Sequence, residues 1–144
     1  MEVESERNGD EKFREAFGAH TGISQLCEGR IYLIRNKDPV LKEFLLDLDD
    51  AALFTDFAWE LLGGHIADND HLGTINLSRC GLTDSKMQML SRGLANGSQL
   101  KHLDISENNF GVGGIRSIVP FLENSRNICR LDIGDNRINA ECFE

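Results

Sequence analysis

The sequence has few basic residues relative to acidic ones, and this imbalance narrows the range of partners. Fifteen Lys and Arg residues stand against 24 Asp and Glu, which gives a formal net charge of −9. Nucleic acids and anionic membrane surfaces are bound by clustered Lys and Arg side chains. The composition therefore predicts that neither is a partner, and it favours a partner protein with a basic surface.

Close cysteine pairs and long apolar runs are also missing. A structural zinc site usually takes its ligands in close pairs, whereas the four cysteines here are widely spaced: Cys27, Cys80, Cys129 and Cys142. We therefore expect no metal and no cofactor. No apolar run approaches the roughly 18 residues of a transmembrane helix, and the acidic N-terminus lacks the pattern of a signal or transit peptide. These features predict a location in the cytoplasm or the nucleus.

The N-terminal residues show helical patterns. Residues 1–22 are expected to form an acidic, poorly ordered leader with a short helix over 11–17, whose apolar face holds Phe13, Ala16 and Phe17. A second helix is predicted over 23–34, because apolar residues recur there at helical spacing: Ile23, Leu26, Cys27, Ile31 and Ile34. It should end before Pro39, since the residue before a proline is disfavoured in a helix.

After Pro39 an eleven-residue pattern recurs with a fixed period. Residues 72–82, 100–110 and 128–138 each fit L-x-x-L-x-L-x-x-N/C-x-L, and successive copies are 28 positions apart. Alternate apolar side chains on a short strand point to one side and can enter a common core. At the ninth position a small polar side chain can bond backbone groups that the turn leaves unpaired. We expect a structural ladder there, formed by Cys80, Asn108 and Asn136.

The second half of each unit has helical spacing. Apolar residues recur as Met87, Leu90 and Leu94, and again as Ile115, Ile118 and Leu122. Pro120 is predicted to shorten or kink the latter helix. An earlier, degenerate unit has a helix match at Trp59, Leu62 and Ile66, and a strand over 41–46 that lies 31 residues before the next one. We expect about three extra residues between that strand and its helix, since terminal repeats are usually atypical.

These patterns divide the chain into three parts. The leader occupies 1–22, a helical N-terminal cap with the degenerate first repeat occupies 23–71, and repeats occupy 72–144, two complete and the third truncated. The last unit stops before its helix, although a repeat buries its apolar face only by stacking on a neighbour. We therefore expect a fragment of a longer repeat protein or a truncated gene product. A partner that covers the edge would also explain it.

The period, the outer helices and the positions of Gly111 and Gly114 resemble the ribonuclease-inhibitor-like class of leucine-rich repeats. The resemblance implies an α/β leucine-rich-repeat solenoid, a short right-handed horseshoe segment with parallel strands inside and helices outside. It also implies a non-catalytic module that binds another protein through the concave face. The Ran GTPase-activating proteins are similar in repeat class and acidity, so a regulator of an enzyme is an alternative. The sensor part of a larger repeat protein is another.

Strand residues that alternate with the core leucines should line the concave face. Nine such positions are predicted to bind the partner: Thr74, Asn76, Ser78, His102, Asp104, Ser106, Arg130, Asp132 and Gly134. Neighbouring strands lie about 4.8 Å apart, so Asn76, Asp104 and Asp132 should form a row. The alternative interpretation is that these positions are polar only because an exposed strand face must be.

His102, Asp104 and Ser106 have the residue types of a hydrolase triad. Positions two apart on one strand lie about 6.6 Å from each other and point in parallel, whereas a triad needs a hydrogen-bonded relay. The sequence also lacks the Gly-x-Ser-x-Gly motif of a nucleophile elbow. We therefore predict no catalytic residue and do not expect an enzyme.

Overall fold

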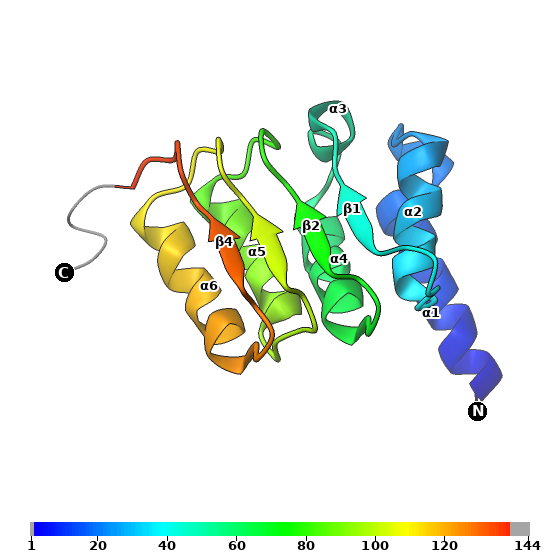
Figure 1. Cartoon of the computed structure of the whole chain (residues 1–144). Helices are drawn as coiled ribbons and strands as arrows, with labels where there is room; N and C mark the ends of the chain where they lie inside the picture. The colour runs from blue at the N-terminus through cyan, green and yellow to red at the C-terminus, as the bar shows by residue number, and fades with distance from the viewer. Residues whose placement is uncertain (1, 139–144) are drawn as a thin grey trace.

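The chain forms a short solenoid with strands in one layer and helices in the other (Figure 1). This computed structural model describes residues 2–138, and their side chains from residue 8 onward. Three-residue strands pair in parallel in the order β1, β2, β3, β4, at Glu43–Leu45, Thr74–Asn76, His102–Asp104 and Arg130–Asp132. The first three strands are followed by α4 (Asp56–Asp68), α5 (Asp84–Leu94) and α6 (Val112–Asn124). The leucine-rich-repeat solenoid predicted from the sequence is confirmed.

The strand register reproduces the period of the sequence. Ile75 pairs with Leu103, and Leu103 pairs with Leu131, a step of 28 residues, whereas Phe44 pairs with Ile75 at a step of 31. Helices α4 and α5 nevertheless begin 28 residues apart. The three additional residues therefore lie between β1 and α4, as predicted, and this segment contains the short helix α3 (Leu48–Ala51).

The N-terminal helices extend the core beyond the first strand. Helix α1 covers Glu2–Phe17, followed by the 3-10 turn η1 (Ala19–Thr21) and by α2 (Gln25–Arg35). The first helix begins at Glu2 rather than near residue 11 as predicted, because its polar residues are adequate helix formers that continue from the apolar segment packed into the core. The apolar face predicted for it is confirmed, since Phe13, Ala16 and Phe17 are all buried.

Helix α2 ends at Arg35, before Pro39, as predicted. The prediction that Leu26 lies on its buried apolar face is wrong. Cys27, Ile31 and Ile34 are buried, whereas Leu26 is 65% exposed. One continuous cluster of buried side chains runs from Phe13 in α1 to Phe121 in α6. The division into leader, cap and repeats therefore stays a prediction.

The N-terminal ends of the helices are capped by side chains, in one case from the preceding repeat. The hydroxyls of Thr55 and Thr83 accept hydrogen bonds from the first-turn amides of α4 and α5, at 3.1 and 3.3 Å. Helix α6 begins after Gly111, which has no capping side chain. Asp84 of the preceding repeat replaces it, because its Oδ1 accepts from the amides of Gly111 and Gly114 at 2.7 and 2.8 Å. Each repeat therefore depends on its neighbour for more than apolar burial.

The predicted shortening of the helix at Pro120 is wrong. Helix α6 spans 13 residues and runs through Pro120. A proline inside a helix leaves one carbonyl, here that of Arg116, without its helical donor. Both residues lie on the exposed side of α6, where water can reach that carbonyl. Across residues 2–138, no helix combines the length and apolar character needed to cross a membrane.

Candidate functional site

The sheet leaves one side free of helices (Figure 1). We call this side the strand face and define it by the outward-pointing residues of the four strands: Glu43, Leu45, Thr74, Asn76, His102, Asp104, Arg130 and Asp132. The register places Asn76 beside Asp104 and Asp104 beside Asp132, which confirms the predicted row. The same row continues into β1, where Leu45 pairs with Asn76. Residues 41–46 were predicted to belong to the cap, so this fourth strand of the face was not expected.

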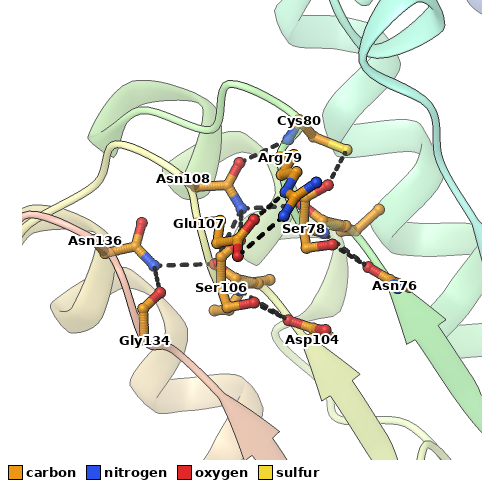
Figure 2. Close-up of polar contacts among 12 residues, drawn as sticks. Asn76, Ser78, Arg79, Cys80, Asp104, Ser106, Glu107, Asn108, Gly134 and Asn136 are labelled. Carbon is orange, nitrogen blue, oxygen red and sulfur yellow. Dashed lines mark hydrogen bonds and ion pairs between the residues drawn. The ribbon is translucent and has the colours of Figure 1, made fainter.

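The remaining predicted residues lie just past the strands and are bonded to the row. The amide and hydroxyl of Ser78 donate to Asn76 Oδ1 at 2.9 and 2.7 Å. Ser106 makes the same two bonds to Asp104 Oδ1, at 2.9 and 2.6 Å (Figure 2). Asn76 and Asp104 therefore hold the turn at the end of each strand, a structural task in addition to any contact with a partner.

In the third copy Gly134 replaces the serine, and the carboxylate of Asp132 bonds other partners. Asp132 Oδ2 lies 2.7 Å from His102 Nε2 and 3.1 Å from Arg130 Nε. The hydrogen bond from His102, followed by the bond from Arg130, holds the pKa of Asp132 below its ordinary value. The hydrogen bond from His102 therefore joins β3 and β4 at Asp132, where Arg130 of β4 adds an ion pair.

No hydrolase relay forms among the residues that suggested one. Asp104 is bonded to Ser106, whereas His102 is bonded to Asp132 of the next strand. His102, Asp104 and Asp132 could nevertheless hold a metal ion, since their ligand atoms all lie within 4.8 Å of one another. Asp132 belongs to another repeat, so no local sequence pattern predicts this grouping. The pairing of Asp104 with Asp132 in the sheet and the hydrogen bond between His102 and Asp132 account for the proximity without an ion.

The asparagine ladder connects the strand ends of successive repeats. Asn108 Oδ1 accepts from the amides of Cys80 and Leu82 of the preceding repeat at 2.9 and 3.0 Å. Its Nδ2 lies 3.0 Å from three carbonyl oxygens, those of Leu77, Ile105 and Ser106 (Figure 2). Asn108 therefore bonds backbone groups of its own turn and of the preceding repeat.

The other two ladder residues repeat the arrangement. Asn136 Nδ2 lies 3.0–3.2 Å from the equivalent carbonyls, those of Ile105, Ile133 and Gly134. The thiol of Cys80 is 3.3 Å from the carbonyl oxygen of Leu46 in the preceding unit and 3.5 Å from that of Ser78 in its own repeat. Burial raises the pKa of Cys80 to about 12, so the sulfur keeps the proton that makes it a weak donor.

The residue before each ladder position has a left-handed backbone. Arg79, Glu107 and Asp135 have φ angles of 56°, 54° and 53°, a conformation that non-glycine residues rarely adopt. Arg79 and Glu107 form an exposed ion pair between neighbouring repeats. Their hydrogen bond raises the pKa of Arg79 and lowers that of Glu107. The regular turn geometry keeps the strand face continuous from one repeat to the next.

Comparison with known proteins identifies the repeats. A family model described as Leucine Rich Repeat matches residues 99–124, which contain β3 and α6. No curated protein matches the chain. A solved structure entitled "Leiomodin-1 Actin-Binding Site 2 (ABS2)" is similar with a TM-score of 0.66 and 16% sequence identity. The match covers 79% of this chain and 65% of that one, so this chain spans less than two thirds of the other's length. Neither match distinguishes the ribonuclease-inhibitor-like class from other leucine-rich repeats.

Proposed function

We propose that this leucine-rich-repeat protein is a non-catalytic interaction module that binds another protein through its strand face. The observation that carries the proposal is the open sheet: α4, α5 and α6 lie on its other side, while α1 and α2 flank the end of the sheet beside β1 (Figure 1). All eight residues of the strand face are at least partly exposed. A continuous surface of this kind suits an extended contact with a folded partner, which is how solenoids generally bind.

The chemistry of the strand face favours a protein partner with a basic surface. Three carboxylates, those of Glu43, Asp104 and Asp132, lie on it with one guanidinium, that of Arg130. Complementary charge mainly raises the rate and specificity of association. The similar solved structure is named an actin-binding site, which makes actin one defined partner to include in a test.

The proposed lack of catalysis is supported by the same geometry. A nucleophile needs a base within hydrogen-bond reach, but Ser106 donates to Asp104 rather than to a histidine. His102 is held by Asp132 on the neighbouring strand. In the described part of the chain these contacts fit a surface stabilised for recognition.

The test compares two charge-reversed variants. Asp104→Arg with Asp132→Arg changes the strand face, while Glu60→Arg with Glu123→Arg makes the same charge change on exposed positions of α4 and α6. Proteins captured from a cell extract are quantified by mass spectrometry, and filamentous actin is tested separately by co-sedimentation. We expect the strand-face variant to lose partners that the helix-side variant retains. The circular dichroism spectrum and urea midpoint of each variant are compared with those of the unmodified chain, because Asp104 also bonds Ser106 at the end of β3. Equal recovery by the two variants would refute the proposal.

A further inference from the structure

The N-terminal end of the strand face is hollowed. One hollow of about 400 Å³ lies over β1 and β2, with Leu45, Asn76 and Arg30 in its lining. A second, of about 360 Å³, lies between α2 and the start of α3 and is lined by Leu26, Leu45 and Asp49 among others. Arg30 and Leu45 line both hollows, which are therefore adjacent.

Leu45 is the apolar exception in a polar row. Its equivalents in the next three strands are Asn76, Asp104 and Asp132. Leu45 is 58% exposed, and Leu26, which shares the second hollow, is 65% exposed. A scattered exposed leucine needs no explanation, but two that line one concavity on an otherwise polar face suit an inserted apolar side chain.

The surroundings of these leucines are acidic. The two hollows are lined by four carboxylates, those of Glu43, Asp47, Asp49 and Asp50, and by one guanidinium, that of Arg30. The carboxylate of Asp50 already accepts hydrogen bonds from the amide and the hydroxyl of Ser24, at 2.8 and 2.9 Å. Within residues 8–138, Glu43 and Asp49 enter no ion pair.

The nearby carboxylates also affect the pKa of a thiol that lines the second hollow. Cys27 lines this hollow and is nearly buried. Burial, with a further contribution from Asp50, raises the pKa of its thiol to about 12, and Arg30 acts in the opposite direction. The thiol is therefore neutral, and the hollow combines an uncharged floor with an anionic rim.

We propose that the two hollows around Leu45 are the anchor site for a basic segment of the partner protein, with an aliphatic side chain inserted between flanking Lys or Arg residues. This inference rests on the proposed function and specifies where on the strand face the partner is anchored and by what chemistry. The inserted side chain covers Leu45 and Leu26, while the flanking cations approach Glu43 and Asp49. The polar row on β2 to β4 then supplies the remainder of the contact.

The experiment uses a library of displayed peptides selected against the whole chain. We expect the enriched peptides to carry an aliphatic residue next to Lys or Arg. Their affinity for Leu45→Ser, measured by fluorescence anisotropy, should fall about tenfold or more, because a buried aliphatic contact is lost. The matched control is Val119→Ser on α6, where an aliphatic side chain of similar exposure (40%) lies on the helix side. It should change affinity by less than about twofold.

The outcomes separate this inference from the proposed function. Peptides that are weakened by the double reversal at Asp104 and Asp132 but not by Leu45→Ser would overturn the anchor site and leave strand-face binding standing. Peptides that are insensitive to both variants would overturn both proposals. Enrichment of acidic peptides, or failure to enrich any peptide, would also overturn the anchor site.

Discussion

Replacing Asn108 by alanine should destabilise the protein far more than the same change at Asn136. Asn108→Ala removes the acceptor of two backbone amides, those of Cys80 and Leu82, and the donor to three carbonyls. Each buried backbone group left without a partner costs about 1–3 kcal/mol. Since Asn108 is only partly buried, water can satisfy some of these groups, and we expect a total loss of about 2–4 kcal/mol.

The comparison with Asn136 isolates the amide bonds that Asn108 accepts from the preceding repeat. Asn136 bonds three carbonyls in the same way, but it accepts from only one amide, that of Phe110, at a longer 3.4 Å. Asn136→Ala should therefore cost about 1 kcal/mol. Asn108→Cys should fall between the two alanine variants, because Cys80 shows that a thiol can occupy this position while offering a weaker donor and acceptor.

Urea unfolding followed by circular dichroism measures these differences. With a urea dependence of about 2 kcal/mol per molar, Asn108→Ala should shift the midpoint by roughly 1–2 M. Equal midpoints for Asn108→Ala and Asn136→Ala would refute the view that the two amide bonds accepted by Asn108 add to the stability of the stack.

Three further perturbations test the core, the helix packing and the pH response. Leu103→Ala should lose about 2–5 kcal/mol, because Leu103 is 1% exposed; an unchanged urea midpoint would contradict its place in the core. Gly93→Ala should lower the free energy of unfolding by about 1–3 kcal/mol, since a Cβ there would collide with the carbonyl oxygen of Glu60 in α4. The control Gly29→Ala has open space around the new Cβ and should be neutral or slightly stabilising in the same measurement. Burial lowers the pKa of His65 from 6.5 to about 4. As the pH falls below 6.5, the unfolded chain therefore takes up a proton at this histidine before the folded chain does. About 1–2 kcal/mol of the free energy of unfolding should be lost between pH 6.5 and 4. Urea midpoints of His65→Leu should lack this part of the pH dependence, and an equally steep loss in the variant would exclude His65 as its source.

The repeat pattern predicted most of the fold because its physical causes are local. The spacing of Leu103 and Ile105 defines a strand side, and the position of Asn108 defines a turn whose backbone needs partners. The 28-residue period then aligns equivalent residues, so the row of Asn76, Asp104 and Asp132 followed directly. Where the pattern degenerates, at residues 41–46, the strand was located but its contribution to the strand face was not recognised.

The features that sequence reasoning missed depend on contacts between distant residues. The pairing of His102 with Asp132 joins two repeats, and no local pattern specifies it. The close approach of α4 and α5 at Gly63 and Gly93 departs from the repeat period, so a search for the period could not find it. The hollows around Leu45 form because α2 lies beside β1. That position is determined by core packing rather than by helix propensity.

The central proposal is that a protein partner binds the strand face, and site-specific photocrosslinking tests it most directly. A benzophenone amino acid is placed at Thr74, in the middle of the strand face, or at Gln88, which is exposed on α5. After irradiation with the partners recovered by capture, we expect a crosslinked protein from position 74 and none from position 88. Crosslinking from position 88 alone would contradict binding through the strand face.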